Sequence, residues 1–504
     1  MRDTTQNLAE NQVSDLPLCV DLDGTLAAVD TFYTSVFALL RKNFLYLVLF
    51  PFWLLRGKAY VKQQVAQRSP IDLEELPLHR GVLEFLLEEH ARGRSLILTT
   101  GADRRVAHRI SETLGIFSEV ISSDGSFNLT GPRKAAVLAE KFGATGFDYI
   151  ANSEVDLDVW RSAANAYVVT NSSELLEKAR AVSNIAGVFS FEEKSASLSD
   201  YISIARPDHW FKNVFVLPGM LLAYFFFPVA LTGSLLADIF LSLAAVCLVA
   251  SSNYVINEIL DAERDRHHPV KKQRPLAAGR VSIPIAYAEW IVLGIVGAVL
   301  GFSVNLGVGL SCAALWIMGT LYNIPPVRTK EVPYLDVLSE AVNNPIRMAI
   351  GWYAMGVAVV PPVSALFAYW MFGSFLMATK RFAEYRRIGD PERAAEYRWS
   401  FHYYNEERLI MSSVFYIAMF MTGAMAFVTL YRLELVFSMP VVAYLLAYYL
   451  YLGFKPDSPV QYPELLYKER HLTNAVLVCT IICTCLFFYD IPEFRKMFVL
   501  LTPP

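Results

Sequence analysis

The chain has 504 residues, of which 54% are hydrophobic and 18% are charged. Soluble domains carry about 25% charged residues, so these values exclude a fully soluble protein and a disordered chain. Six cysteines in a chain of this length are too few for a disulfide scaffold. The formal net charge of -4 gives no indication of a nucleic-acid partner.

Charged residues are frequent in the first part of the chain and sparse in the second. We expect a polar tail over 1–16, a soluble domain over 17–195, a membrane domain over 200–492 and a C-terminal tail over 493–504. The first tail has no apolar run, so we expect no signal peptide.

In the soluble domain, short apolar runs alternate with helical patterns such as Arg104–Leu114 and Lys134–Phe142. This alternation predicts a multi-domain protein whose first domain is α/β, with a parallel sheet covered by helices. Active sites in such sheets lie at the carboxyl ends of the strands. The expected strands are Pro17–Val20, Ser95–Thr99, Glu119–Ser122, Phe147–Ala151 and Ala166–Val169.

The first expected strand is followed by Asp21-Leu22-Asp23-Gly24-Thr25. Two carboxylates at this spacing beyond a strand can face one cation, and Asp21 can attack a phosphoryl group. The segment resembles the first motif of the haloacid dehalogenase superfamily of phosphatases, which implies a Rossmann-like α/β fold. By this resemblance, Asp21 is the nucleophile, Asp23 is the acid/base, and Mg²⁺ is the cofactor.

Further motifs of that superfamily follow in the expected order. The resemblance implies that Thr100 and Lys134 bind phosphate and that Asp156 joins Asp21 and Asp23 at the metal. One position departs from the pattern, because Asn152 stands where the last motif normally has an aspartate. The domain is therefore either an active phosphohydrolase or a degenerate copy kept for regulation, and both hypotheses stay open.

A cap-like insertion occupies about 30–80 and contains the apolar run 44–55. Twelve residues are too few to span a bilayer. Two interpretations remain, a segment lying at the membrane interface or against the membrane domain, and a buried cap helix. The run is flanked by basic residues, namely Arg41, Lys42, Arg56, Lys58 and Lys62.

After residue 200 the sequence predicts an all-α membrane domain of nine transmembrane helices, since each crossing needs about 20 apolar residues. Lys and Arg are concentrated in the loops after the second, fourth, sixth and eighth spans. This distribution predicts a multi-pass protein of the inner membrane with its N-terminal domain in the cytosol and its C-terminus outside. We interpret all six cysteines as packing residues rather than metal ligands. The expected spans are 209–228, 235–257, 284–303, 306–323, 335–356, 360–380, 409–431, 435–454 and 473–491.

Near the end of the second span, Asn257, Asp261 and Asp265 are spaced four residues apart. They therefore share one face of a helix, and acids at membrane depth usually serve a function. Oxygen ligands in this arrangement suit Mg²⁺, which commonly bridges to substrate phosphates. Cations that can hold anions follow directly and predict a diphosphate site. These cations are Lys271, Lys272 and Arg274.

This segment resembles the first signature of the UbiA superfamily of intramembrane prenyltransferases, Asn-Asp-x-x-Asp-x-x-x-Asp, with Glu258 at the first aspartate. The resemblance extends over about 200–492 and agrees with the expected nine helices. It implies that Lys212 lies near phosphate and that Arg328 and Lys330 face the diphosphate.

The second Asp-x-x-x-Asp of prenyl-diphosphate users is not present after the sixth span, where Lys380 and Arg381 precede a single acid, Glu384. Together with Asp265–Gly279, this resembles the decaprenyl-phosphate phosphoribosyltransferase branch. That branch transfers 5-phosphoribose from phosphoribosyl diphosphate to a polyprenyl phosphate. Arg347, within the fifth span, either meets a phosphate or pairs with Glu340.

Three hypotheses for the function remain. The first is phosphoribosyl transfer to polyprenyl phosphate at a Mg²⁺-diphosphate site, after which the fused phosphatase removes the 5-phosphate. The second is transfer of a prenyl group from polyprenyl diphosphate to an aromatic acceptor, with a degenerate regulatory domain. The third is a lipid-binding or transport protein without catalysis. Nothing in the sequence indicates the oligomeric state.

Overall fold

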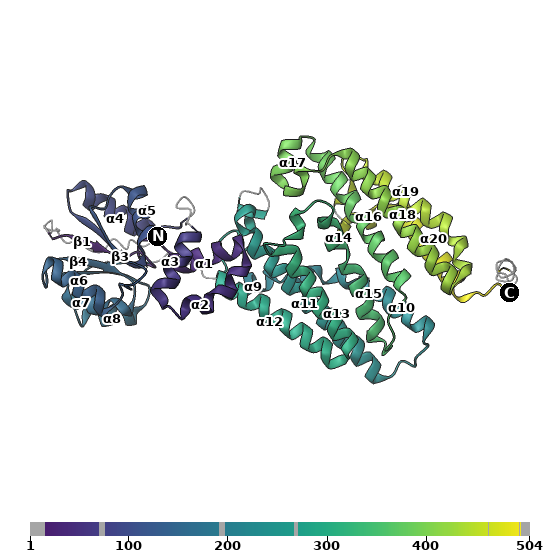
Figure 1. The fold of residues 1–504 in the computed structure, drawn as a ribbon, viewed down its shortest axis with the longest axis horizontal. Coiled ribbons are helices and arrows are strands. Elements are labelled where there is room, and N and C mark those ends of the chain that lie inside the picture. Colours follow the sequence, from purple (N-terminus) through teal and green to yellow (C-terminus); the bar gives the residue numbers. More distant parts are fainter. Residues whose placement is uncertain are drawn as a thin grey trace, which may run out of the picture. The chain divides into compact units, whose positions relative to one another are not determined.

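The computed structural model describes residues 16–69, 76–190, 197–266, 271–461, 463–492 and 494. The chain divides into two compact units, one ending at Lys194 and the other beginning at Ser195 (Figure 1). The first unit contains all the strands of the described residues, and the second consists of helices.

The first unit is built on a six-stranded parallel sheet with the strand order β3-β2-β1-β4-β5-β6. The chain runs outward in one direction as far as β3 and then returns to the other side of β1, which is the doubly wound arrangement. The five predicted strands are confirmed, and β6 adds a sixth. The strands are β1 (Leu18–Val20), β2 (Leu96–Asp103), β3 (Glu119–Ser123), β4 (Asp148–Ala151), β5 (Asn165–Val169) and β6 (Asn184–Phe189).

Helices cover both faces of this sheet, as Figure 1 shows. Val20 and Leu98 face one helical layer, and Cys19 and Ile97 face the other, because successive side chains of a strand alternate. Burial on both faces explains why the inner strands are continuous apolar runs. The first layer is α4 (Arg80–Ala91) and α5 (Arg104–Leu114), and the second is α6 (Pro132–Phe142), α7 (Leu157–Ser162) and α8 (Ser173–Arg180).

The insertion between β1 and α4 is helical. Asp30 begins its first helix by accepting hydrogen bonds from the backbone N–H groups of Phe32 and Tyr33. Within the apolar run, Trp53 is buried, but Val48 and Leu55 are 64% and 87% exposed. The buried interpretation is therefore wrong for the outer face of this segment within its own unit, and the interfacial one stays a prediction. The elements are α1 (Thr31–Lys42), η1 (Phe44–Leu49), α2 (Phe50–Leu54) and α3 (Lys58–Arg68).

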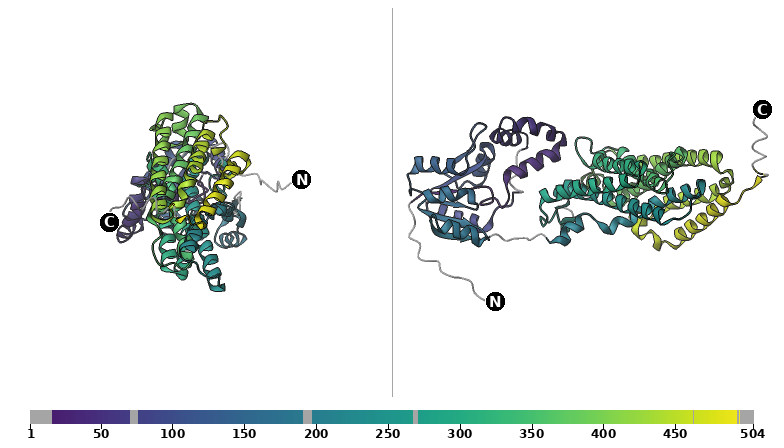
Figure 2. Two further views of the ribbon diagram at one scale, coloured as in Figure 1. Left: turned by 90° about the vertical axis from the view of Figure 1, so that its right-hand side faces the viewer. Right: turned by 90° about the horizontal axis from the view of Figure 1, so that it is seen from below.

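The second unit is a bundle of helices that lie side by side (Figures 1 and 2). Six helical segments of the described residues are long and apolar enough to cross a membrane, which makes this a multi-pass membrane protein. These segments are Gly233–Arg266 (α11), Ile283–Val304 (α12), Leu306–Asn323 (α13), Glu406–Tyr431 (α18), Leu433–Gly453 (η7 and α19) and Arg470–Phe488 (α20).

The other three expected spans take a different form, so the predicted count of nine is not confirmed. The first is divided between the 3₁₀ segment η3 and helix α10, and the fifth between α14 and α15. The sixth continues past its expected end as α16, whose last turns carry several charged residues. Their bounds are η3 (Pro207–Val216), α10 (Leu217–Phe226), α14 (Leu335–Ala341), α15 (Asn343–Ala354) and α16 (Val363–Ile388).

Close packing of α11 against α13 sets the geometry of the polar end of this unit. A Cβ atom at Gly319 would lie 2.1 Å from the side chain of Asn253, so only glycine permits this approach. One helical turn further along both helices, Asn257 meets Asn323. At a rise of 1.5 Å per residue, the 34 residues of α11 extend about 51 Å, well beyond the thickness of a bilayer core. The acidic end of α11 therefore has length to emerge from the membrane.

Candidate functional site

The predicted acid Asp261 lies at the centre of a charged cluster at the end of α11. Its Oδ1 atom accepts hydrogen bonds from Lys330 Nζ at 2.7 Å and from the Arg328 guanidinium at 3.2 Å. Both cations come from the loop after α13, as predicted. Burial lowers the pKa of Lys330 to about 8, although Asp261 acts in the opposite direction. Lys330 therefore still carries a positive charge at neutral pH.

Asn323, at the end of α13, connects this cluster to Asn257. Its Oδ1 atom accepts from Asn257 Nδ2 at 2.9 Å and from Lys330 Nζ at 3.1 Å. The predicted site set did not include Asn323. The available indication was its position directly before the loop that carries Arg328 and Lys330.

Asp265, one turn beyond Asp261, is buried and has its own basic partners. Its carboxylate lies 2.5 Å from the Arg274 guanidinium and 4.0 Å from Lys271 Nζ. Lys272 is exposed. The structure thus brings Asp261 and Asp265 together with four of the predicted cations. Glu331 also lies here, 2.8 Å from Arg328 and 3.3 Å from Arg264. Counting these two residues as well, positive charge still exceeds negative charge around the two acids.

Glu258, which replaces the first aspartate of the signature, points to a different partner. Its carboxylate lies 3.4 Å from the Arg206 guanidinium and accepts a hydrogen bond from the backbone N–H of Leu276. The longer side chain therefore ties α11 to the preceding segment and to the basic loop.

Backbone strain is concentrated near this cluster. Among the described residues of the second unit, three that are not glycine have a left-handed backbone: Arg206 (φ 49°), Arg328 (φ 32°) and Tyr334 (φ 66°). Such conformations persist only where the surrounding contacts hold them, and they are frequent at functional sites. Two of the three are cations that contact the α11 carboxylates.

The oxygen atoms on α11 suit a metal that is shared with substrate. The described residues contain no group of three Asp, Glu, His or Cys side chains close enough to hold an ion by themselves. Mg²⁺ is normally bound by one or two carboxylates, with substrate phosphates and water completing its shell. Asn257, Asp261 and Asp265 therefore fit a Mg²⁺ ion that arrives with a diphosphate, but not a permanent protein-only site.

Arg381 does not fit its predicted role as a free phosphate-binding cation. It is fully buried and lies 3.4 Å from Asp336, 3.0 Å from Glu340 and 3.3 Å from Glu384. Asp336 and Glu340 come from α14, and no local pattern predicted either of them as a partner of Arg381. Its neighbour Lys380 is half-buried and interacts electrostatically with Glu384.

Arg347, on α15, is separate from both clusters. Its Nε atom donates to Asn213 Oδ1 at 3.0 Å. The alternative pairing with Glu340 is wrong, because Glu340 is engaged by Arg381 and by the Tyr322 hydroxyl. Lys212 precedes Asn213 in η3 and is half-buried.

In the first unit, the strand ends bring together Asp21, Lys134 and Asp156, as predicted. Lys134 Nζ lies 2.8 Å from Asp21 and 3.3 Å from Asp156, and Tyr149 completes the cluster with hydrogen bonds to Lys134 and Asp156. Burial raises the pKa of Asp21 to about 7, although Lys134 opposes this rise. Burial alone would lower the pKa of Lys134, but the two carboxylates outweigh it and the pKa is raised.

Asp23 and Asn152 lie beside this cluster but have different partners. Asp23 Oδ1 accepts from the backbone N–H and the hydroxyl of Thr31, the first residue of the helical insertion. Asn152 Oδ1 accepts from the Thr25 hydroxyl at 3.2 Å, and its side chain packs on Gly24, where a Cβ would approach to 2.2 Å. Asp21, Asp23 and Asp156 thus do not form a ready metal cluster, and a cation there would also need substrate oxygens.

Thr100 lies at the same edge, since Val20, Leu98 and Ile150 are paired across β1, β2 and β4. Its hydroxyl accepts from the backbone N–H of Ala102, and the side chain is buried. The ends of β2 and β4 flank the end of β1. The direction of the winding changes at β1, and this is the usual ligand position in such sheets.

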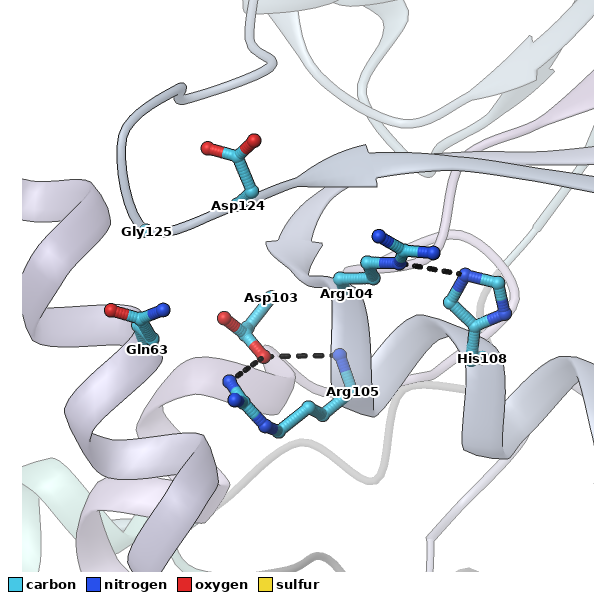
Figure 3. A pocket seen from close by; sticks show the side chains of 7 residues that line it. All are labelled: Gln63, Asp103, Arg104, Arg105, His108, Asp124 and Gly125. Carbon is cyan, nitrogen blue, oxygen red and sulfur yellow. Dashed lines mark hydrogen bonds and ion pairs between the residues drawn. The ribbon is translucent and has the colours of Figure 1, made fainter.

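A cavity of about 440 Å³ opens near the end of β2 (Figure 3). Asp103 pairs there with Arg105, and Arg104 contacts His108. The lining does not include Asp21 or Lys134, so this cavity is not the phosphate site itself. The lining residues are Gln63, Asp103, Arg104, Arg105, His108, Asp124 and Gly125.

Several known proteins are similar to parts of this chain. An uncharacterised protein of Sinorhizobium fredii is 29% identical over 347 residues, 69% of this chain and 65% of that protein. The decaprenyl-phosphate phosphoribosyltransferase of Mycolicibacterium smegmatis is 33% identical over 197 residues, 37% of this chain and 57% of that enzyme. The chain therefore spans less than two thirds of the length of either relative.

Among solved structures, a UbiA homolog from Archaeoglobus fulgidus bound to DMAPP and Mg²⁺ superposes with a TM-score of 0.44 at 20% identity. The match covers 57% of this chain and 98% of the homolog. Residues 213–461 match the UbiA prenyltransferase family, and this range contains the α11 acids and all their basic partners except Arg206. Through its second unit, the chain is therefore similar to the UbiA prenyltransferase family.

Proposed function

We propose that the second unit transfers 5-phosphoribose from phosphoribosyl diphosphate to a polyprenyl phosphate. The observation that carries this proposal is the excess of cations around Asp261 and Asp265, where Lys330, Arg328, Arg274 and Lys271 converge. Donor and acceptor together bring a diphosphate and two phosphates, so their site needs more positive charge than a site for one diphosphate. The similarity to decaprenyl-phosphate phosphoribosyltransferase supports the same assignment.

Asn257, Asp261 and Asp265 would hold Mg²⁺, which neutralises the charge of the leaving diphosphate. Lys330 and Arg328 are already directed at the acid end of α11 and bind the diphosphate oxygens as charge develops on them. Asn323 keeps the Lys330 ammonium in place through its carbonyl oxygen. These groups are positioned before substrate arrives, which lowers the cost of reorganisation.

The reaction exchanges one bond at the ribose C1 atom for another. The bond from C1 to the diphosphate oxygen breaks, and an oxygen of the lipid phosphate forms the new bond as C1 develops positive charge. The acceptor oxygen is already anionic, so the step needs no strong general base. The products are a lipid-linked ribose 5-phosphate and inorganic diphosphate.

Prenyl transfer to an aromatic acceptor is the second candidate for this unit. It would call for acids at the end of α16 that can hold a further cation. The acids there surround the Arg381 guanidinium, which already supplies the positive charge. This arrangement favours the phosphoribosyl assignment over the prenyl one.

The test is to incubate the purified full chain with Mg²⁺, labelled phosphoribosyl diphosphate and polyprenyl phosphate. We expect a labelled lipid product, which EDTA abolishes. A parallel reaction contains polyprenyl diphosphate and a hydroxybenzoate. A prenylated aromatic product with no labelled lipid would reject the proposal, and binding of lipid without either product would indicate a binding or transport protein.

For the first unit, we propose phosphomonoester hydrolysis with Asp21 as nucleophile. The contact of Lys134 with both Asp21 and Asp156 supports this, because it sets a cation beside the carboxylate that would attack. The product of the membrane unit carries a 5-phosphate, which is a candidate substrate. Hydrolysis of an aryl phosphate by the full chain, abolished by Asp21→Asn and retained by Asp158→Asn, would establish the activity. No hydrolysis in either protein would favour a regulatory role.

We also propose that the first unit faces the cytosol and that the chain lies in the inner membrane. The support is the concentration of Lys and Arg in alternate loops, including the loops after α11 and α13. The same orientation gives soluble phosphoribosyl diphosphate access to Lys330. Protease digestion of sealed, inside-out vesicles should remove the first unit, whereas right-side-out vesicles should protect it.

A further inference from the structure

Arg347 is a cation inside the membrane unit to which the described part of the chain supplies no carboxylate. It is half-buried, and it makes no ion pair among the described residues. Its Nε atom donates to Asn213 Oδ1. The groups with which it interacts electrostatically are neutral, namely Tyr254, Tyr369 and Cys247.

Three other cations of this unit that are at least partly buried are neutralised by acids. Lys330 and Arg274 pair with Asp261 and Asp265, and Arg381 pairs with three carboxylates. A guanidinium at membrane depth without such a partner is costly. The cost is offset when an anion binds, and the uncompensated charge of Arg347 therefore points to an anionic ligand.

The contacts around Arg347 hold its side chain in one orientation. Asn213 Nδ2 donates to Cys247 Sγ at 3.2 Å, which turns the amide oxygen toward Arg347. One turn along α15, a Cβ at Gly351 would lie 2.0 Å from the backbone oxygen of Val216, so α15 and η3 are in backbone contact. Nε is thus occupied, whereas the two terminal amino groups make no hydrogen bond to a described residue and can take part in a bidentate contact with phosphate.

Arg347, on α15, lies beside a different part of α11 from the one that carries the acid cluster. Its neighbour Tyr254 precedes Asp261 by seven residues, which is two helical turns on the same face, or about 10 Å. The Arg347 site is therefore further into the bundle than the diphosphate site, and both sites line the same side of α11.

We propose that Arg347, with Asn213, Tyr254 and Tyr369, binds the phosphate group of the isoprenoid acceptor. The role of this lipid as acceptor rests on the proposed function, whereas the binding of its phosphate by Arg347 does not. A soluble donor brings its phosphates from the aqueous end of α11. A lipid phosphate must keep its tail in hydrocarbon, so its headgroup reaches the site from the membrane side, where Arg347 lies. The two substrates then meet between Arg347 and Asp261.

The test measures binding of farnesyl phosphate to the purified full chain without any donor, with farnesol as the uncharged comparison. A charged hydrogen bond is worth enough that Arg347→Gln should weaken farnesyl phosphate binding about ten- to a hundredfold. Farnesol binding should stay unchanged. The matched control is Arg408→Gln, an exposed arginine at the start of α18, which should leave both unchanged.

Steady-state kinetics separate the two sources of phosphate. Arg347→Lys and Tyr369→Phe should raise the KM for polyprenyl phosphate and leave the KM for phosphoribosyl diphosphate unchanged. A rise only in the donor KM would assign Arg347 to the 5-phosphate of the donor and overturn the proposal. Because Tyr369→Phe keeps the arginine, it remains informative if Arg347→Gln does not fold.

Failure of the proposal and failure of the proposed function give different results. If no phosphoribosyl transfer occurs but farnesyl phosphate binding still depends on Arg347, the acceptor site stands and the reaction is wrong. If transfer occurs and farnesyl phosphate binding is the same in Arg347→Lys, Tyr369→Phe and the unaltered chain, the acceptor site is wrong and the reaction stands.

Discussion

The two candidate sites of this protein differ in the sign of their charge. In the first unit, Lys134 lies between the carboxylates of Asp21 and Asp156. A second cation, Lys62, interacts electrostatically with Asp23 and Asp30, so four acids lie near two cations. In the second, three carboxylates, those of Asp261, Asp265 and Glu331, lie among five cations, namely Lys330, Arg328, Arg274, Lys271 and Arg264. The first arrangement leaves negative charge for a metal ion to neutralise, and the second leaves positive charge for phosphates.

This difference suggests how each site would use magnesium. An acid-rich site can attract the cation before substrate arrives, although Asn152 weakens that attraction by one charge. A cation-rich site repels a bare divalent ion, so Mg²⁺ would enter already bound to the diphosphate. We therefore expect the two units to respond differently when single charges are removed or added.

The largest effect should come from Asp261→Asn in the second unit. It removes the carboxylate that holds Lys330 and Arg328 and that would ligate Mg²⁺, an interaction worth several kcal/mol in the transition state, so we expect transfer to fall on the order of a thousandfold. Initial rates of labelled lipid formation measure this change. The matched control is Glu263→Gln, an exposed acid two residues along the same helix, which should retain the rate.

Arg381→Gln should act on stability rather than on phosphate binding. It leaves three carboxylates around a buried position without their cation, which costs about 3 kcal/mol or more. We expect a marked fall in the thermal unfolding midpoint of the full chain in detergent, with Arg408→Gln as the control. An unchanged midpoint together with a raised donor KM would instead return Arg381 to the phosphate-binding set.

In the first unit, Asn152→Asp should increase the difference in charge between the two candidate sites. It restores an anionic ligand at the end of β4 without changing the size of the side chain that packs on Gly24. We expect aryl phosphate hydrolysis to rise roughly tenfold at limiting Mg²⁺, because about 1.4 kcal/mol of added attraction gives that factor. Asn171→Asp, at an exposed position after β5, adds the same charge away from Gly24 and is the comparison. No gain at any Mg²⁺ concentration would count against a metal at this position.

The smallest effect should follow from Val48→Ser combined with Leu55→Ser on the outer face of the insertion. Both side chains are exposed, so we expect the free energy of unfolding to change by less than about 0.5 kcal/mol for each. Trp53→Ala, in the same segment but buried, should cost about 3 kcal/mol or more. A large loss from the serine pair in detergent would mean that another part of the chain covers this face.

Much of the architecture was readable from local patterns. Alternating apolar runs predicted the strands of the first unit, and β6 was missed because its burial alternates weakly along an edge strand. The spacing of four placed Asn257, Asp261 and Asp265 on one helical face. The predicted count of nine spans is not confirmed, because Asp336, Glu340 and Arg347 interrupt the fifth apolar run and the structure divides it into α14 and α15.

By itself, the sequence determined which residues share a helical face or a strand end, since the geometry of one helix or strand is set by the chain. Only the tertiary structure decided that Lys134 reaches an aspartate 113 residues away, that Asn323 joins Asn257 to Lys330, and that Arg381 is neutralised while Arg347 is not. Those contacts depend on how neighbouring helices are rotated and how closely they approach. Rotation and approach follow from packing across distant segments, which no local pattern records.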